Sequence, residues 1–593
     1  MLLGAPARAA DPVHYTVSFA PSGDATLDSL LRQTSTLVDL QQKLPPAPFA
    51  LIGRARADAQ QFLTVLHSLG YDDGSVDITI NGAKLDDPAL PDALTQAPSS
   101  ETEKVQVTPA KGARFTLGRV DLPGLPPGFP RPAMVKPGEP AFAAPILAAQ
   151  PALLTALHNA GYAYASVGAP VAVADPATHL LDVSYSINPG PRVDIGPITF
   201  TGLKRMDADF LRRHIALATG QLYSDTAIQA ARDSLIGLGV FSSVTPEPPS
   251  PVNAQGQAPI TFRTLEQKRH AVTLSGLYAT DTGISIGTSW LDRDLFGHAE
   301  TLTLSAAAND LGGTGTTSAG YDLKTAFAKP DFYARGQTLN LSVEWLKESL
   351  TAYSRRALLI GASLNRPIDP QKTITFGPNF VSERVDQQGV SRSYVLLQFP
   401  INFSWNTSDS LLEPTHGFNA SLTLTPTMPI IGKSHMFIIA LGSLAGYLPV
   451  EPDGRGIIAM RGQVGSIQGA QHFQVPPDQR FYAGGSGTVR GYTYQIIGPL
   501  FPDNTPEGGA AMDAFSIEFR QHITKTIGIV PFIDAGQVSA GNAPFTGTLR
   551  VGAGIGARYY TGIGPIRLDV AVPLTRTAGS NGFALYIGLG EAF

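Results

Sequence analysis

The sequence contains no cysteine, which excludes disulfide bonds and thiolate chemistry. Charged residues make up only 15% of the 593 residues, well below the usual quarter, and a net charge of −5 indicates no basic face for nucleic acid. Long apolar runs are also missing. The longest, residues 436–450, is interrupted by glycine and serine and is shorter than the roughly eighteen apolar residues of a membrane-spanning helix. These absences argue against a nucleic-acid-binding protein and a helical membrane protein.

Glycine and proline are abundant, with 61 and 48 residues, and the mean hydropathy is +0.04. Short apolar–polar alternations bounded by turn residues fill the second half of the chain, as in β-strands. Two classes of protein fit this composition. One is a soluble glycine-rich β protein. The other is a transmembrane β-barrel, in which the hydrophobic signal of each strand is weak because only alternate residues face lipid.

The first residues resemble the end of an export signal. Ala7, Arg8 and Ala9 have the small-x-small form of a cleavage site, although no basic region or full apolar region precedes them. We therefore predict that residues 1–10 are the remainder of a signal peptide. An ordinary alanine-rich terminus is the alternative.

The first half repeats one pattern three times: an amphipathic helix, a glycine that ends the helix, and a strand. The helices are expected at residues 57–69, 151–160 and 226–238, each followed by glycine and an apolar or aromatic residue. We predict α+β units at residues 11–110, 111–192 and 193–265, of which the third is the clearest. A sheet with an exposed edge could bind an extended segment by strand addition. The simpler alternative is that the units are spacers.

The second half, residues 266–593, predicts an antiparallel transmembrane barrel of sixteen strands. Each strand is about ten to thirteen residues long, as a tilted membrane-spanning strand requires, and an even number suits closure without a polar edge in lipid. The predicted strands are 267–279, 282–292, 298–309, 317–328, 336–348, 355–365, 372–385, 394–406, 417–427, 435–450, 456–469, 514–523, 527–539, 549–561, 564–574 and 583–593.

The alternation of side chains in the last strands fits a lipid-facing wall. Successive residues of a strand point to opposite faces, and charged residues gather on one face, away from the apolar face. An arginine or lysine on the lipid face would cost about 2–4 kcal/mol near the midplane. A soluble sandwich would show a similar alternation, so strand length and strand number favour the barrel. In the last strand the residues that share the apolar face are Phe583, Leu585, Ile587, Leu589 and Phe593.

One long stretch, residues 470–513, interrupts the strands with almost no alternation, and such a run is usually functional or disordered. The guanidinium group of Arg490 in this loop is positively charged and holds several N–H donors in a fixed planar arrangement. By strand parity Glu518 and Asp534 both face the lumen, so an inward-folded loop would bring Arg490 to these acids. The alternative is that all of these are ordinary lumen charges, together with Arg520, Arg550, Arg558, Arg567 and Asp569. The central motif of the loop is Val489, Arg490, Gly491 and Tyr492.

This motif resembles the signature loop of the Omp85 superfamily, the outer-membrane barrels with periplasmic POTRA repeats, and the three N-terminal units resemble POTRA domains. In that family the loop arginine meets the aspartate of a Phe-x-Asp-x-Gly strand, which implies a pair of Arg490 and Asp534 here. Residues 293–297, 412–418, 564–569 and 588–593 also resemble turns and closing strands of the family. Three units, rather than two or five, most resemble the translocation and assembly module branch, TamA.

The resemblance implies an outer-membrane barrel whose repeats lie in the periplasm. It would assist unfolded β-barrel and autotransporter clients to insert through a lateral seam between the first and last strands. The expected seam residues are Gly588, Gly590 and Phe593, since glycine weakens strand packing. The expected partners are the lipid bilayer, these clients and a TamB-like protein anchored in the inner membrane. A general insertase of the BamA type and a two-partner secretion pore are the alternatives.

No catalytic residue, cofactor or metal is expected. Residues 552–557 formally fit a dinucleotide-binding pattern, but a strand follows where a helix would have to bind pyrophosphate. Residues 484–488 lack the last glycine of a nucleophile elbow, and the eleven histidines show no metal-ligand spacing. We therefore expect that the protein is not an enzyme and does not bind nucleic acid.

Overall fold

The computed structural model describes residues 13–98, 102–131, 135–279, 283–313, 315–432, 435–451, 454–562, 564–575 and 582–593. The predicted signal-peptide remnant, residues 1–10, lies outside this part of the chain. Two compact units are formed, Met1–Thr199 with Leu217–Ala230 and Pro246–Thr261, and Phe200–Ala216 with Ala231–Thr245 and Phe262–Phe593. In the described ranges no helix combines the length and apolar character needed to cross a membrane.

The first α+β segment is a four-stranded sheet packed against helices. Its elements are β1 (Tyr15–Phe19), α1 (Ala25–Thr34), α2 (Thr36–Asp39), α3 (Pro48–Ser68), β2 (Ser75–Ile80), β3 (Ala83–Lys84), α4 (Leu90–Gln96) and β4 (Glu103–Ala110), in the sheet order β1-β4-β2-β3. Leu27, Phe62 and Val107 are fully buried in the core. Gly70 follows the longest helix with a φ of +76°, so the glycine ends the helix in the left-handed conformation that the pattern predicts.

The second segment is a three-stranded sheet with one long helix. Its elements are β5 (Thr116–Asp121), α5 (Ala143–Asn159), β6 (Ser166–Val167), β7 (Val171–Asp175), β8 (Leu180–Ser184) and β9 (Ile187–Asn188); β5-β8-β7 form the sheet and β6 pairs with β9. The helix begins at Ala143, ahead of the predicted start at Pro151, which lies inside it. The apolar stripe extends across the proline, because Ile146 is buried before it and Leu153 after it.

The third segment leads into the barrel. Its elements are β10 (Asp194–Thr201), α6 (Ala208–His214), α7 (Asp225–Gly237), β11 (Phe241–Pro246) and β12 (Gln257–Glu266), in the order β10-β12-β11. Glu266 ends the last strand, and its Oε1 accepts hydrogen bonds from the backbone N–H groups of Lys204 and Arg205 at 2.7 and 2.9 Å. Burial would raise the pKa of Glu266, but these bonds hold it below its usual value.

Within the second unit, the segment around α6 contacts two turns of the barrel. The backbone N–H of Asp207 donates to the carbonyl of Gly297 at 2.9 Å, in the turn at residues 293–297 that resembles one of the Omp85 family. His214 Nδ1 lies 2.7 Å from a carboxylate oxygen of Asp331, in a second turn. This end of the barrel is therefore the end from which the chain enters it.

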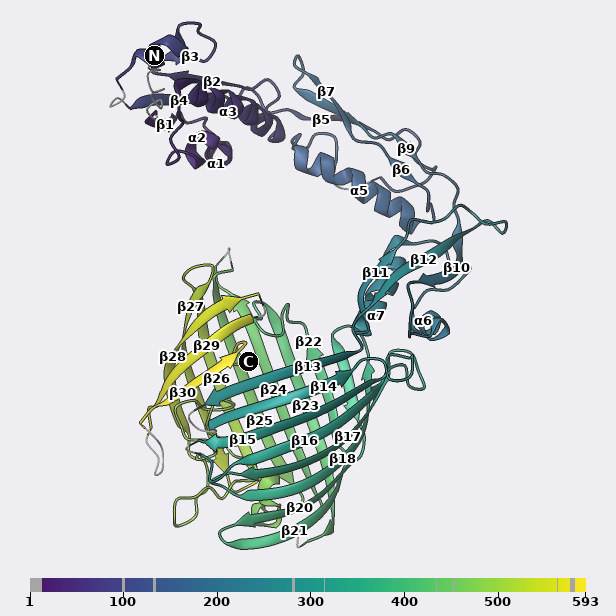
Figure 1. Ribbon diagram of the computed structural model, residues 1–593, viewed down its shortest axis with the longest axis vertical. Coiled ribbons are helices and arrows are strands. Elements are labelled where there is room, and N and C mark those ends of the chain that lie inside the picture. The colour runs from purple at the N-terminus through teal and green to yellow at the C-terminus, as the bar shows by residue number, and fades with distance from the viewer. Residues whose placement is uncertain are drawn as a thin grey trace, which may run out of the picture. The chain divides into compact units, whose positions relative to one another are not determined.

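The barrel is closed and antiparallel, and Figure 1 shows its strands running obliquely. Its strands are β13 (His270–Ala279), β14 (Gly283–Asp292), β15 (Thr301–Gly312), β16 (Gly320–Lys329), β17 (Thr338–Ser349), β18 (Ser354–Pro367), β19 (Lys372–Phe376), β20 (Asn379–Gln387), β21 (Val390–Gln398), β22 (Ile401–Asn406), β23 (Gly417–Ile431), β24 (Phe437–Pro449), β25 (Gly456–Gln468), β26 (Ala511–His522), β27 (Ile527–Ser539), β28 (Arg550–Thr561), β29 (Gly564–Pro573) and β30 (Ala584–Leu589). The predicted sixteen-stranded fold is confirmed, because β19 with β20 and β21 with β22 each form one interrupted strand.

The two interruptions are corrections to the predicted strands 372–385 and 394–406. They fall at Gly377–Pro378 and Phe399–Pro400, at neighbouring places in the wall. Proline has no N–H to donate to the strand beside it, so the ladder of hydrogen bonds breaks at both places. Strand β18 consequently pairs with β20 along one part of its length and with β19 along the other.

The alternation of faces that the sequence predicts is present in the C-terminal strands. In β27, Ile529 and Ile533 are 40% and 50% exposed on the outer face, whereas Phe532 and Asp534 are almost completely buried on the inner face. The same alternation of exposed and buried residues runs from Phe515 to Arg520 in β26, after four buried residues. The inner face of these strands is buried because the loop between β25 and β26 fills the lumen beside it.

Candidate functional site

The long loop between β25 and β26 fills this side of the lumen. It contains two short 3-10 turns, η1 (His472–Gln474) and η2 (Pro477–Gln479), and a few isolated backbone bridges. Val489 and Tyr492 of the central motif are completely buried and pack with Ile467, Met512 and Val538 of the barrel wall. The loop thus folds inward and forms an apolar core of its own against the strands on either side of it.

Arg490 forms a two-pronged contact with Asp534. Its Nε lies 2.7 Å from Oδ2 and its Nη2 lies 2.9 Å from Oδ1, while its backbone N–H donates to Oδ2 at 3.0 Å. Both side chains are almost completely buried. Paired, planar geometry of this kind is the strongest form of carboxylate–guanidinium contact, and it fixes the direction in which the loop crosses the lumen.

The same guanidinium also reaches two further acids. Its Nη1 lies 2.8 Å from Glu518 and 3.1 Å from Asp569, on β26 and β29. The guanidinium carbon is 3.5 Å from the centre of the Phe532 ring, which lies beneath it. One loop residue therefore ties together strands β26, β27 and β29 of the wall.

Two more arginines balance these carboxylates. Arg520 lies 2.9 Å from Glu518, and Arg558 lies 2.6 Å from Asp569 and 2.7 Å from Glu591. Taking away one member of a buried ion-pair network leaves an opposite charge without compensation, at a cost of about 3–5 kcal/mol. The network therefore holds the loop in one position.

The two residues after Arg490 extend the contact toward the last strands. Gly491 has a φ of +95°, and a Cβ there would lie 2.7 Å from the carbonyl carbon of Val572, so only glycine lets the loop approach β29 this closely. Its N–H donates to the hydroxyl of Tyr586 on β30 at 3.2 Å. The Tyr492 hydroxyl donates to the carbonyl of Val551 at 3.0 Å.

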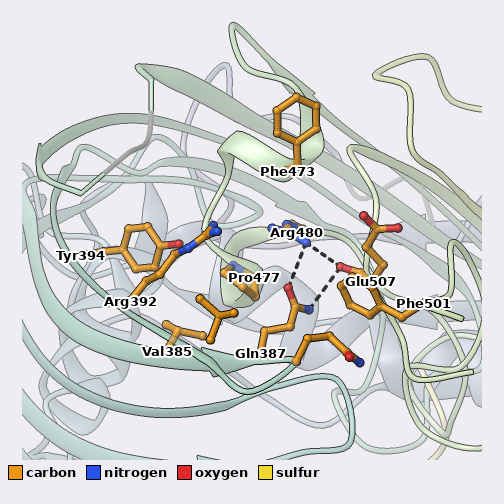
Figure 2. Close-up of a pocket in the computed structure, with 11 residues that line it drawn as sticks. Val385, Gln387, Arg392, Tyr394, Phe473, Pro477, Arg480, Phe501 and Glu507 are labelled. Carbon is orange, nitrogen blue, oxygen red and sulfur yellow. Dashed lines mark hydrogen bonds between the residues drawn. The ribbon is translucent and has the colours of Figure 1, made fainter. Parts of the chain in front are cut away.

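A second set of contacts fastens the earlier part of the loop to the opposite wall. Figure 2 shows Arg480 beside Gln387 and Glu507; its Nη1 donates to the Gln387 side chain at 3.3 Å and to the Glu507 carbonyl at 2.8 Å. Asp478 lies 2.9 Å from Arg355 of β18. A pocket of about 250 Å³ remains between this part of the loop and β20–β21. The loop spans the lumen between its two anchors.

The seam between the first and last strands is short. In the part of the chain that the structure describes, β13 and β30 are joined by two residue pairs, Tyr278 with Ile587 and Ala279 with Tyr586. Ten pairs join β13 to β14. The first strand is also exposed on both faces: Leu274 is 81% exposed, and its neighbours Thr273 and Ser275 are exposed as well.

The predicted seam residues lie at or beyond the end of this pairing. Gly588 pairs with Arg567 of β29 and is one residue past the last seam pair. Gly590 has a φ of +85°, which turns the chain out of the strand after Leu589. The predicted strand 583–593 is therefore too long at its end.

Strand parity predicts that Phe593 lies on the lipid-facing side, but the structure places it on the inner side. Its carbonyl accepts a hydrogen bond from Arg520 at 2.9 Å, and its ring lies 5.2 Å from that guanidinium and 4.8 Å from that of Arg461. The turn at Gly590 ends the alternation, and the two arginines then hold the ring on the inner side of the wall.

A family model described as the Omp85 superfamily domain matches residues 294–593, slightly over half of the chain. The POTRA model, described as a surface antigen variable number repeat, matches residues 193–267.

The chain belongs to the Omp85 superfamily.

Two outer membrane protein assembly factors named BamA are similar to this Omp85 protein. The one from Neisseria meningitidis is 22% identical over 80% of this chain and 66% of its own length, and the one from Nitratidesulfovibrio vulgaris is 22% identical over 82% and 63%. The match thus spans just under two thirds of each relative. The crystal structure of BamA from Haemophilus ducreyi lacking POTRA domains 1–3 superposes with a TM-score of 0.64 over 80% of this chain and all of that one, at 18% identity.

The Omp85 barrel lies in the outer membrane and the POTRA segment lies in the periplasm. The turns at Gly297 and Asp331, which contact the third segment, are consequently at the periplasmic end. The loop around Arg490 enters the lumen from the opposite, extracellular end.

Several residues of this Omp85 site have no distinguishing signal in the sequence. The sequence pattern does not distinguish Asp569 from ordinary lumen charges, although it shares an inward face with Arg567, and it gives Tyr586 and Glu591 no role at the site. Parity puts Tyr586 on the face opposite the apolar one, whereas nothing local indicates that Glu591, after the turn at Gly590, approaches Arg558. Among the described residues no cluster of three or more possible metal ligands occurs.

Proposed function

We propose that this protein is a non-enzymatic assembly factor that helps unfolded β-barrel and autotransporter clients to fold into the outer membrane. The observation that carries the proposal is the seam, where the first and last strands share two residue pairs in the described chain. The backbone groups of β13 beyond these pairs form a strand edge. An incoming client strand would pair with this edge by strand addition.

The short length of the last strand also favours a locally thinned bilayer beside the seam. Strand β30 has six residues, fewer than the nine to eleven that a tilted strand needs to cross a bilayer. Its outward side chains Ile587 and Leu589 therefore cover a short apolar band. A bilayer that thins to match a short band lowers the barrier to insertion.

The loop motif is linked to the seam through one residue. Tyr586 pairs with Ala279 across the seam, and its hydroxyl accepts the hydrogen bond from Gly491 in the motif. In this proposal the Arg490 network keeps the C-terminal wall rigid, and opening occurs at the weak contact between β13 and β30.

A disulfide tether across the seam tests the proposal, and the absence of cysteine makes an introduced pair unique. Tyr278→Cys with Ile587→Cys places two thiols on directly opposite residues that are both exposed on the outer face. After oxidation, the protein in liposomes should no longer accelerate the folding of a urea-unfolded β-barrel client, and reduction should restore the activity.

Ile555→Cys with Val570→Cys is the matched control, because these residues are also directly opposite and exposed, but on β28 and β29. The oxidised control should retain full activity, and both variants should keep the heat-dependent gel migration of a folded barrel. Equal activity of the oxidised and reduced seam variant would rule out the seam mechanism.

We further propose a TamA-like specialisation, with POTRA-like units at residues 11–110, 111–192 and 193–265 and a TamB-like partner anchored in the inner membrane. Three α+β segments before the barrel support it. The edge strand β7 of the second segment is suited to strand addition, because all five residues are exposed and Val171 and Val173 are each 63% exposed.

Deletion of the gene distinguishes the specialised role from its alternatives. Loss of a subset of outer-membrane proteins would support the TamA-like role. Depletion of all barrel proteins would indicate a general insertase of the BamA type instead, and loss of one secreted protein would indicate a two-partner secretion pore.

A further inference from the structure

The outer surface of the barrel has an apolar hollow beside the two interrupted strands. It has a volume of about 490 Å³ and is lined by Phe327, Leu341, Val343, Ile360, Ala362 and Phe380. Pro378, at one of the interruptions, also lines it, and a smaller hollow of about 210 Å³ shares Pro378 and Leu397 with it. The break in the strand ladder thus leaves a dent in the wall that faces lipid.

A cleft with positive charge lies at the periplasmic end of the same strands. It has a volume of about 350 Å³ and is lined by Arg213 of α6, by Lys329 at the end of β16 and by Arg335 in the turn after it. Among the described residues no carboxylate forms an ion pair with Arg213. Arg335 donates to the carbonyl of Ile215 at 3.3 Å.

The carboxylates near the cleft have partners already. Asp331 lies in the cleft lining, but one of its oxygens is 2.7 Å from His214 Nδ1 and the other accepts the N–H of Gly336 at 2.7 Å. Glu300, which is almost completely buried, lies 3.5 Å from Lys329 Nζ. Three cations face two carboxylates, Asp331 in the lining and the buried Glu300 beneath Lys329, so the cleft keeps a net positive charge and is suited to an anion.

Strand β16 connects the cleft to the hollow. Phe327 lines the hollow and Lys329 lines the cleft, two residues further toward the periplasm on the same face of the strand. Two residues of a strand span about 7 Å. Tyr333, at the tip of the adjacent turn, is 98% exposed, as aromatic residues at a membrane–water interface often are.

We propose that the cleft and the hollow together bind one anionic phospholipid from the periplasmic leaflet. The phosphate of the head group is held by Arg213, Lys329 and Arg335, and an acyl chain lies in the dent between β17 and β20. The occupant is a lipid rather than a free phosphate, because a cationic cleft at the level of the head groups continues along one strand face into an apolar hollow at the level of the chains.

The binding test uses the full-length protein in nanodiscs of phosphatidylcholine with a minor fraction of phosphatidylglycerol, and native mass spectrometry measures the phosphatidylglycerol retained. Arg213→Gln should lower retention roughly fivefold, as expected for one cation near a head group. Arg212→Gln is the matched control: it removes the same charge one residue away, from a side chain that pairs with Asp209 outside the cleft. It should leave retention unchanged.

The second arm separates a lipid from a free anion. Ala362→Phe fills the hollow and should also lower retention, whereas Ala420→Phe, on the same outer face of the wall at β23, should not. Retention equal to that of the unaltered protein in Arg213→Gln and in the triple variant Arg213→Gln, Lys329→Gln, Arg335→Gln would overturn the proposal. Displacement of phosphatidylglycerol by inorganic phosphate, with no effect of Ala362→Phe, would overturn it too, because the cleft would then be a phosphate site.

Discussion

The two sides of this barrel are built from the same kind of strand but differ in what covers their inner face. In β27 exposed and buried residues alternate, because the loop around Arg490 lies against the inner face. In β13 successive residues such as Thr273 and Leu274 are exposed on both faces. One wall has a core on its inner side, and the other has lipid outside and open lumen inside.

The difference shows how an antiparallel barrel can combine a rigid wall with a weak contact. Backbone pairing alone makes most neighbouring strands equivalent. What distinguishes β26 to β29 is the buried ion-pair network around Arg490, and what distinguishes β13 is the small number of pairs it shares with β30. The rigid side and the open side meet at Tyr586, which belongs to both.

Replacement of Arg490 should have the largest effect, because it would make the rigid side resemble the open one. Arg490→Met leaves Asp534, Glu518 and Asp569 buried without their shared cation and should destabilise the barrel by about 3–5 kcal/mol. Arg490→Lys keeps the charge but not the two-pronged geometry, so its effect should be smaller. Urea unfolding in detergent measures the loss, and protease sensitivity of the loop reports its release.

Arg392→Met is the control for this prediction. Arg392 also projects into the lumen from the wall but is exposed, and its replacement should change stability by less than about 0.5 kcal/mol. If the two variants unfold at the same urea concentration, the network does not hold the loop in place.

Mutation of the contact between α6 and the turn after β16 should have an intermediate effect on stability. This turn belongs to the open side of the barrel. Burial alone would raise the pKa of Asp331, but the hydrogen bonds from His214 and Gly336 lower it below its usual value of 3.8. A carboxyl group with a lowered pKa stabilises the folded state above its ordinary pKa, and this contribution is lost as the pH falls through the lowered value. The contact should therefore be intact at neutral pH and weaken below about pH 4.

Amide hydrogen exchange of α6 measures this contact at the two pH values. Asp331→Asn should raise exchange at neutral pH by an amount equivalent to about 1–2 kcal/mol and should remove most of its dependence on acid. Asp209→Asn is the control, because Asp209 lies on the same helix with a side chain that is 71% exposed. Unchanged exchange in Asp331→Asn would show that other contacts hold α6 to the barrel.

The smallest effect is expected at the end of the last strand. Gly590→Ala places a Cβ on a residue with a φ of +85° and should cost about 1 kcal/mol, because L-residues disfavour this conformation. Gly588→Ala has no such strain, and its Cβ would lie 3.1 Å from the flexible side chain of Arg567. Thermal unfolding of both variants tests the difference, and an equal loss in the two would show that the turn at Gly590 does not depend on glycine.

Much of the barrel could be predicted from the chain because its signals are local. Strand parity places Asp534 on the inner face, where the structure has it, and the even number of strands suits a closed barrel. The interruptions at Pro378 and Pro400 do not show in the sequence pattern, because alternation continues on both sides of each break. The sequence predicts α5 too short, because Pro151 suggests a helix start although the apolar stripe extends before it.

The sequence by itself determined which residues of the regular strands face inward and that the acids on the inner face would need a cation, since both follow from the two-residue period of a strand and the cost of an unpaired charge. Only the tertiary structure decided that Asp534, Glu518 and Asp569 share Arg490, that Phe593 turns inward, and that β13 meets β30 over two described pairs. These facts depend on strand register and barrel closure, which join residues far apart in the chain and leave no local pattern.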